Sequence, residues 1–178
     1  LAYSELIKCF CKAYDPATAD SELGVVLRTS YFRKEPVVRA SLKESYELVI
    51  SDLEKAESLL DEKYDSFDSP YFTDASANAI RARVALYMQD WDNAVKYSTR
   101  LIESDAFSLA TARSYVTTSQ TFLDYMWTND TSYEHIWRIG YTQTSYGNPQ
   151  GSVFLNFTTD YTYYYPDYVP AQWVLDLY

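Results

Sequence analysis

The sequence has few of the residues that build metal sites, disulfide frameworks and glycine-rich nucleotide loops. Its 178 residues include one histidine, His135, two cysteines, Cys9 and Cys11, and four glycines. Two cysteines make no disulfide framework, and together with a single histidine they argue strongly against a zinc site of His and Cys ligands. Neither a G-x-G-x-x-G motif nor a P-loop occurs. We therefore expect no cofactor and no metal.

Basic residues and long apolar runs are also scarce. Fifteen Lys and Arg stand against twenty-five Asp and Glu, a formal net charge of −10. Binding to a phosphate backbone needs clustered Lys and Arg, so we expect no nucleic-acid partner. Nothing approaches the run of about 18 apolar residues that marks a membrane-spanning helix. Because no cap closes the pattern near Leu1 or Tyr178, we expect an internal piece of a longer protein.

What the sequence has in excess is aromatic side chains. Nineteen Tyr, eight Phe and four Trp make up 17% of the residues, and 47% of the residues are hydrophobic overall. That apolar content is sufficient for a folded core. Aromatic rings present an apolar face, and Tyr and Trp add a polar group at the edge. The composition therefore favours a rigid surface that recognises a ligand by stacking.

Apolar periodicity predicts a first helix over residues 1–14. Four residues at spacings of three and four form its apolar face, namely Leu6, Cys9, Phe10 and Ala13. On this interpretation Cys9 is a small core residue and Cys11 lies at the edge of the face. A loop should follow over residues 15–40, because its prolines disfavour helix at the preceding positions.

A second helix should begin at Ser41. The stretch Ser41-Leu-Lys-Glu44 is a capping-box pattern, in which the Ser hydroxyl and the Glu carboxylate each accept from the backbone N–H of the other residue. Apolar residues then recur at helical spacing to about residue 60, with charged residues on the other side. We interpret those charges as a solvated face and not as an active site.

The best-marked element is a predicted helical hairpin. Residues 74–89 carry two adjacent apolar stripes, which is typical of a helix buried between neighbours. The first stripe is Ala75, Ala79, Ala82 and Leu86, and the second is Ile80, Val84 and Tyr87. A partner helix is predicted over residues 92–103, with a packing face of Ala94, Val95, Ser98, Leu101 and Ile102. Trp91 lies at the turn and Ala94 follows three residues later, which is the tetratricopeptide pattern.

The predicted fold class is mainly α. We expect tetratricopeptide-like hairpins over residues 1–106, and a loop-rich aromatic segment with short strands over residues 107–178, within one domain. The rings of the second segment either form a platform for a sugar, with Tyr hydroxyls and Asp carboxylates bonding its hydroxyls, or pack as a layer onto the helices. The candidate ligand-binding residues are Trp127, Tyr146, Tyr161, Tyr163, Tyr164, Tyr165 and Asp167.

Other chemistry has less support in the sequence. Trp127 could be a core anchor or a platform. His135 and Trp137 alternate along a predicted strand, which favours a structural role for the histidine and packing for the tryptophan. No G-x-S-x-G motif occurs. A glycosidase needs two carboxylates aimed into a cleft, but spacing supports no such pair among Asp124, Asp160 and Asp167. We expect no enzyme activity.

Several of these segments, in this order, resemble the SusD/RagB family. The capped helix Arg39-Ala-Ser-Leu-Lys-Glu-Ser-Tyr46 is similar to a helix of that family. The stretch from Ala75 to Ala94 resembles its signature hairpin, and Lys96 to Leu109 continues the match. Ser132-Tyr-Glu-His-Ile-Trp-Arg-Ile139 is similar to the segment that the family places next.

The resemblance implies a function that composition does not show. Members of the family are non-catalytic proteins on the surface of Bacteroidetes-type bacteria that bind oligosaccharides or other nutrients. They pass the ligand to a SusC-like TonB-dependent transporter in the outer membrane. A lipidated N-terminal cysteine anchors them, and we expect that anchor to lie outside this chain. A helical scaffold that binds a transporter or a peptide is the alternative interpretation.

Overall fold

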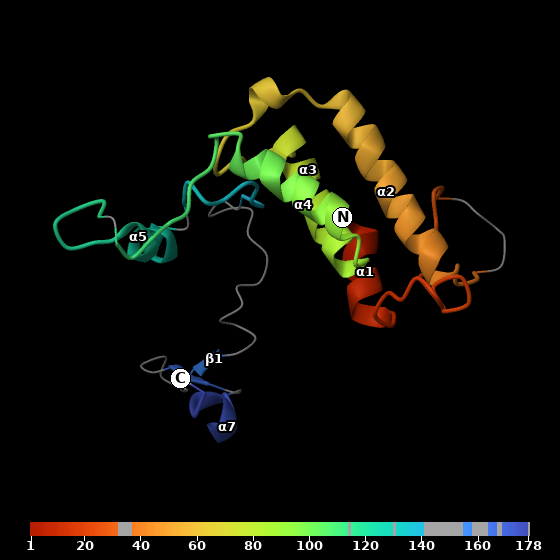
Figure 1. Cartoon of the computed structure of the whole chain (residues 1–178). Coiled ribbons are helices and arrows are strands. Elements are labelled where there is room, and N and C mark those ends of the chain that lie inside the picture. Colours follow the sequence, from red (N-terminus) through yellow and green to blue (C-terminus); the bar gives the residue numbers. More distant parts are fainter. Residues whose placement is uncertain are drawn as a thin grey trace. The chain divides into compact units, whose positions relative to one another are not determined.

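The computed structural model describes residues 1–31, 37–113, 115–129, 131–140, 155–157, 164–166 and 169–177. The elements in chain order (Figure 1) are α1 (Ala2–Phe10), α2 (Leu42–Leu59), η1 (Glu62–Tyr64), α3 (Asp74–Tyr87), α4 (Trp91–Ile102), α5 (Phe122–Asn129), β1 (Leu155–Phe157), β2 (Tyr164–Pro166) and α7 (Gln172–Leu175). Helices dominate and the strands are short, so the predicted fold class is confirmed. No helix among the described residues is long and apolar enough to cross a membrane.

The chain divides into two units, Leu1–Arg138 and Ile139–Tyr178. The first unit holds α1 to α5. In the second, β1 and β2 pair antiparallel, with Asn156 opposite Tyr165. The predicted boundary at residue 106, between the helical hairpins and the loop-rich aromatic segment, stays a prediction.

Helix α2 begins where the sequence predicts. The Ser41 hydroxyl accepts from the Glu44 backbone N–H at 3.1 Å, and the Glu44 carboxylate accepts from the Ser41 backbone N–H at 2.8 Å. The predicted capping box is confirmed. It satisfies two of the backbone donors that a helix start otherwise leaves without a partner.

We expect Ser41→Ala to lower the free energy of unfolding by about 1 kcal/mol, because it removes the side-chain acceptor of this cap. Urea denaturation followed by circular dichroism measures the change. Ser51→Ala is the matched control, since Ser51 is an exposed residue inside the same helix. Equal stability of the two variants would show that the cap contributes nothing.

The predicted face of α1 is wrong by about one position. The helix ends at Phe10, Cys11 is already extended, and the buried residues of the helix are Ser4 and Ile7. Phe10 is 70% exposed. Cys9 is exposed, and Cys11 packs against the core instead. One position on a helix rotates a side chain by about 100°, which is enough to exchange the two faces.

The core of the first unit lies where α1, α2 and α3 meet. The ring of Tyr46 is 4% exposed and meets the edge of Tyr14, with ring centroids 5.1 Å apart. Burial raises the pKa of the Tyr46 phenol to about 12, because the charged form loses its hydration. Apolar residues from all three helices and from the preceding loop complete the core: Ile7, Val25, Leu42, Val49, Leu53, Ile80 and Val84.

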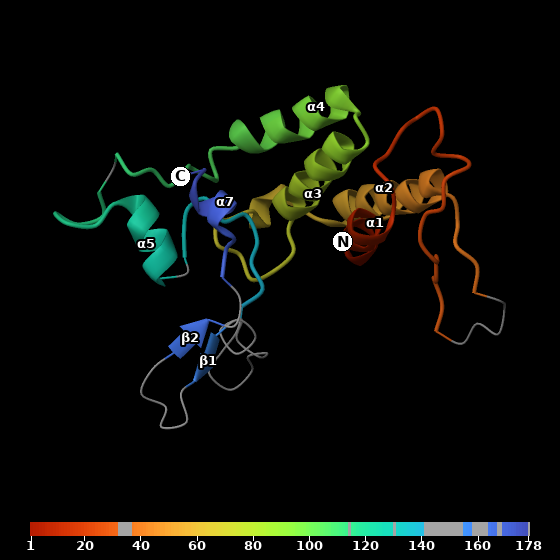
Figure 2. The ribbon, with the colours of Figure 1, turned by 90° about the horizontal axis from the view of Figure 1, so that it is seen from below.

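Helices α3 and α4 form the predicted hairpin, and α3 also packs against α2 (Figure 2). Gln89 turns the chain with a φ of 60°, and the Asp90 side chain caps α4 by accepting from the Asn93 backbone N–H. Ala75 and Ala77 are almost fully buried, as the alanine-rich pattern requires. Leu86 and Tyr87 are 55% and 50% exposed, so the ends of both predicted stripes do not share that packing.

Helix α4 packs on one side only. Tyr97 is buried, and the Arg81 guanidinium lies 4.1 Å from its ring centroid. Val95 and Ile102, expected on the packing face, are 64% and 77% exposed, and Trp91 at the helix start is 58% exposed. The hairpin therefore presents an open apolar side, which we call the outer side of α4 and define by Trp91, Val95 and Ile102.

Candidate functional site

Most of the predicted ligand residues of the loop-rich aromatic segment, residues 107–178, lie where no side chain is described. The backbone of Tyr164 and Tyr165 is described within β2, where they pair with Phe157 and Asn156. Outside the described residues lie Tyr146, Tyr161, Tyr163 and Asp167. Their predicted role in ligand binding stays a prediction.

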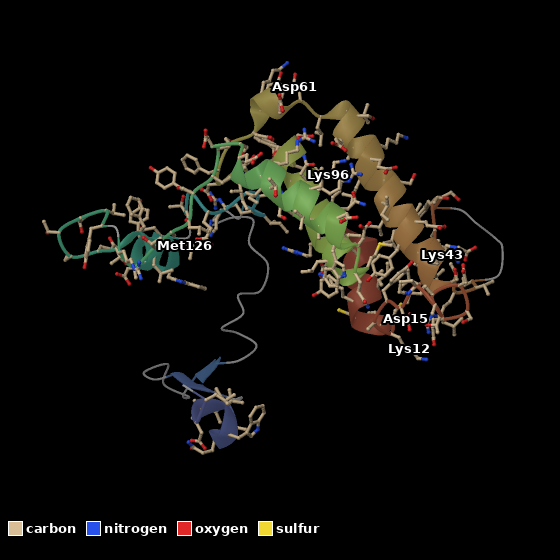
Figure 3. All side chains as sticks on the ribbon, viewed as in Figure 1. Lys12, Asp15, Lys43, Asp61, Lys96 and Met126 are labelled. Carbon is tan, nitrogen blue, oxygen red and sulfur yellow. The ribbon has the colours of Figure 1, made fainter. Side chains whose placement is uncertain are left out.

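Trp127 is the one predicted ligand residue whose side chain the structure describes. It lies on α5 and is 78% exposed, so the interpretation of this ring as a core anchor is wrong. Figure 3 shows α5, marked by the label of Met126, at some distance from the helices of the core. An indole this exposed offers both an apolar face and an N–H donor to a ligand.

The start of α5 is held by a reciprocal cap. The Thr121 hydroxyl accepts from the Asp124 backbone N–H at 3.1 Å, and the Asp124 carboxylate accepts from the Thr121 backbone N–H at 3.2 Å and from its hydroxyl at 2.6 Å. These bonds lower the pKa of Asp124. The Asp124 carboxylate, one of the acids weighed for a glycosidase, is thus engaged in the cap of α5.

The side of α5 away from Trp127 contributes Phe122 and Tyr125 to a group of aromatic rings that the sequence did not predict. The ring centroids of Phe67 and Tyr133 are 4.3 Å apart, and those of Phe122 and Tyr133 are 6.1 Å apart. With Tyr125 these rings form what we call the aromatic cluster. They line a cavity of about 210 Å³ together with Val116, Thr131 and Ser132.

A single carboxylate behind the cluster holds its two loops together. Asp68 has a φ of 56°, and its backbone N–H donates to the His135 carbonyl at 2.5 Å. The Asp68 carboxylate accepts from the Thr131 hydroxyl at 2.8 Å. It also forms an ion pair with Arg138, 2.9 Å from Nε, and lies 3.4 Å from His135 Nδ1, within hydrogen-bond reach. These contacts fix Phe67 beside Tyr133 and give the His135 ring and carbonyl a partner in Asp68, as expected for a histidine in a structural role.

The strand predicted around Trp137 is not formed. The Arg138 backbone N–H donates to the Ser69 carbonyl, and a single isolated bridge joins Ser69 to Trp137. A β-strand needs a series of backbone hydrogen bonds to its neighbour, and one isolated bridge does not provide it. The Trp137 ring packs edge-on against Phe72 with centroids 5.6 Å apart, so its predicted packing role is confirmed.

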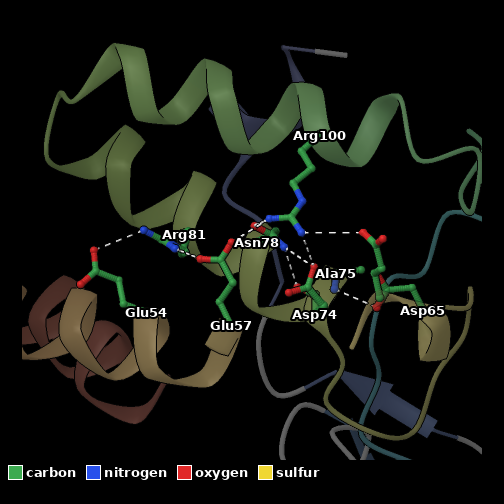
Figure 4. A network of polar contacts seen from close by, with 9 residues as sticks. Glu54, Glu57, Asp65, Asp74, Ala75, Asn78, Arg81 and Arg100 are labelled. Atoms are coloured by element: carbon green, nitrogen blue, oxygen red, sulfur yellow. Dashed lines mark hydrogen bonds and ion pairs between the residues drawn. The ribbon is translucent and has the colours of Figure 1, made fainter. Parts of the chain in front are cut away.

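A charged groove of about 840 Å³ opens over α3 and α4. Figure 4 shows the polar network that its lining residues Asp74, Asn78 and Arg100 form with residues of α2 and α3. Arg100 reaches Glu57 at 2.7 Å and Asp74 at 3.1 Å, Asp74 accepts from Asn78 at 2.7 Å, and Arg81 pairs with Glu57. Each of these groups therefore has a partner from a neighbouring helix or turn.

Burial raises the pKa of Asp74, and the Arg100 charge partly opposes this effect. A raised carboxyl pKa alone is typical of general acids as well as of buried ion pairs. Here Arg100 and Asn78 occupy the carboxylate, so we interpret the network as a link between α2, α3 and α4. Among the described residues no group of three or more His, Cys, Asp or Glu side chains is placed to hold a metal ion.

No protein-family profile matches the chain, and no curated protein matches it significantly. Solved structures do match. A SusD superfamily protein from Bacteroides thetaiotaomicron superposes with a TM-score of 0.65 at 22% identity over 81% of this chain. A SusD-like carbohydrate-binding protein from Bacteroides vulgatus gives 0.52 at 23% identity over 62%. A further Bacteroides vulgatus protein gives 0.62 at 22% identity over 81%.

At this level of identity the comparisons establish the fold, and the expected SusD-like fold is confirmed. The chain spans 29%, 24% and 31% of the lengths of these three structures. The matched region therefore corresponds to less than a third of each of them.

Proposed function

We propose that the chain is part of a non-catalytic glycan-binding protein on the surface of a bacterium, which hands an oligosaccharide or polysaccharide to a SusC-like TonB-dependent transporter of the outer membrane. The observation that carries this proposal is the exposed ring of Trp127 on a scaffold with a SusD-like fold. One of the matched structures is described as carbohydrate binding. A lipid anchor in the parent protein belongs to the same proposal.

The chemistry of Trp127 suits a sugar. A pyranose ring has an apolar face of C–H groups and a rim of hydroxyls, and an indole can stack on the first and donate to the second. The ring has few rotamers to lose on binding, so little conformational entropy opposes the contact. We include Tyr146, Tyr161, Tyr163, Tyr164, Tyr165 and Asp167 as further ligand contacts.

We expect Trp127→Ala to weaken polysaccharide binding about tenfold, which corresponds to about 1.4 kcal/mol. Native electrophoresis through gels that contain the polysaccharide measures the change in mobility. Trp91→Ala is the matched control, because Trp91 is also exposed but lies on α4. Retardation equal to that of the parent chain would show that the Trp127 ring makes no contact with the glycan.

The outer side of α4 favours a second candidate function, a scaffold for another protein. Exposed apolar residues at helical spacing commonly mark a protein contact. The same two variants distinguish the functions: Trp91→Ala should weaken capture of a transporter and leave glycan binding intact, whereas Trp127→Ala should do the reverse. Loss of both properties in both variants would indicate a general loss of structure.

A further inference from the structure

We propose that the cavity of the aromatic cluster is a subsite for a single pyranose residue, separate from the contact at Trp127. This inference rests on the proposed glycan-binding function and assigns one sugar ring to a defined place on the helical unit. The cavity is formed by Phe67, Phe122, Tyr125 and Tyr133, which come from the loop before α3, from α5 and from the segment after it.

The size of the cavity selects one sugar ring. Its volume of about 210 Å³ is below the range of about 300–1,000 Å³ that is usual for drug-sized ligands. An oligosaccharide therefore does not fit inside it. One terminal or branching residue does, with the rest of the chain continuing into solvent past the exposed edges of Phe67 and Tyr133, which are 42% and 48% exposed.

The lining has the two features that a pyranose requires. Phe67 and Tyr133 are tilted by 53° with ring centroids 4.3 Å apart, so they pack directly on one another and together form an apolar wall on which the C–H face of a sugar can stack. The Ser132 hydroxyl accepts from the Glu134 backbone N–H at 3.1 Å and still has its own proton to donate. In the part of the chain with described contacts, nothing bonds the phenol groups of Tyr125 and Tyr133, which are free to bond sugar hydroxyls.

The walls are fixed before a ligand arrives. Asp68 ties the Phe67 loop to Thr131 and to the backbone of His135, as described above, and Ser132 is buried. A site whose loops are already ordered loses less conformational entropy on binding. The charge-assisted contacts of Asp68 therefore act as the support of the subsite and not as ligand contacts.

Trp127 does not take part in this cavity. On an α-helix, residues two positions apart point in nearly opposite directions, so Tyr125 and Trp127 serve different sides of α5. Phe122 and Met126, four positions apart, lie on the same side. The two aromatic contacts are thus independent, and one can be removed without the other.

The test uses the two methionines as reporters. With [13C]methyl-methionine, Met126 reports on the cluster through ring currents, whereas Met88 lies against the core at the end of α3. A panel of methyl glycosides is titrated into the chain. We expect one glycoside class to shift the Met126 signal saturably and leave the Met88 signal in place. Trp127→Ala should retain this response.

Variants assign the response to the cavity. Phe67→Ala should weaken glycoside binding at least about tenfold. Tyr64→Ala, which removes an exposed ring three residues earlier that does not line the cavity, should change it less than about twofold. Tyr125→Phe, which retains the ring, tests the hydroxyl without opening the cluster. An unchanged Met88 signal shows that each variant is folded.

The outcomes separate this subsite from the proposed function. If the parent chain binds a polysaccharide and Phe67→Ala and Tyr125→Phe bind it equally well, with no Met126 shift by any glycoside, the subsite is wrong and glycan binding stands. If neither glycosides nor polysaccharides bind, both the subsite and the proposed function are overturned.

Discussion

We expect Gly24→Ala to destabilise the first unit by about 3 kcal/mol, the upper part of the range for overpacking a closed site. A Cβ at this position would lie 2.1 Å from the Ser45 hydroxyl oxygen and 2.4 Å from the Ser41 carbonyl oxygen. Side-chain rotation can relieve the first contact. The second contact is with backbone at the start of α2, which cannot move without opening the helix cap.

The surroundings of Gly24 explain why the site cannot yield. Its backbone N–H donates to the Ala40 carbonyl at 2.8 Å, and its carbonyl accepts from Arg39 Nε at 2.6 Å. Ser45 is fully buried, and its hydroxyl donates to Ser41 and accepts from the Val25 backbone N–H. A shift of Gly24 therefore breaks several buried hydrogen bonds at once.

The midpoint of urea denaturation measures the effect of Gly24→Ala. Gly140→Ala is the control, since Gly140 is an exposed residue and carries the same change in side chain. Its midpoint should stay close to that of the parent chain. A Gly24→Ala midpoint within error of the parent would show that the loop over residues 15–25 does not pack against α2 as described.

The second large effect is expected for Arg100→Met. This variant removes the positive charge that faces Asp74, whose side chain is 6% exposed. A buried carboxylate that is left without its partner destabilises the folded chain by about 1–3 kcal/mol. Water screens part of the interaction because Arg100 itself is 43% exposed, so we expect about 2 kcal/mol at neutral pH.

The loss in Arg100→Met should depend on pH in a defined direction. Burial already raises the pKa of Asp74 in the folded chain, and removal of Arg100 takes away the charge that opposes this. A carboxyl with a raised pKa in the folded state binds more protons there than in the unfolded state, so stability falls as pH rises. The difference in the free energy of unfolding between Arg100→Met and the parent chain should therefore shrink as the pH falls from 7 towards the pKa of an Asp carboxyl in the unfolded chain, about 3.9.

Two further variants assign the Arg100→Met effect to Asp74. The double variant with Asp74→Asn should recover most of the lost stability, because it removes the unpaired charge and keeps an acceptor for Asn78. Lys96→Met, which removes an exposed charge from the same helix, should have little effect. Urea denaturation at pH 7 and at pH values near 4 gives all of these differences. A pH-independent loss would contradict the role of Asp74.

Local signals predicted the parts of the fold that depend on residues close in sequence. The capping box of α2 joins Ser41 and Glu44, and the hairpin turn at Asp90 and Trp91 involves residues within one turn of helix. The face of α1 was wrong by one position, because Ile7 and Cys11 contact the core while Cys9 and Phe10 are exposed. Apolar residues stand at both sets of positions, so the spacing alone does not choose between them.

The candidate site was predicted only in part, for a physical reason. Trp127 could be selected from its residue type, but its exposure depends on how α5 packs. The aromatic cluster joins Phe67 to Tyr133 across more than sixty positions, through the carboxylate of Asp68 at a positive φ. No pattern of spacing encodes such a contact, so the cluster becomes visible only in the structure.

The central claim is that this chain binds a glycan and does not cleave it. A fluorescence titration of the chain with plant, host and microbial polysaccharides, followed by chromatography of each mixture after several hours, tests it most directly. We predict a saturable change in tryptophan fluorescence with one class of polysaccharide and no released sugar. Absence of any saturable change, or the appearance of shorter products, would contradict the proposed function.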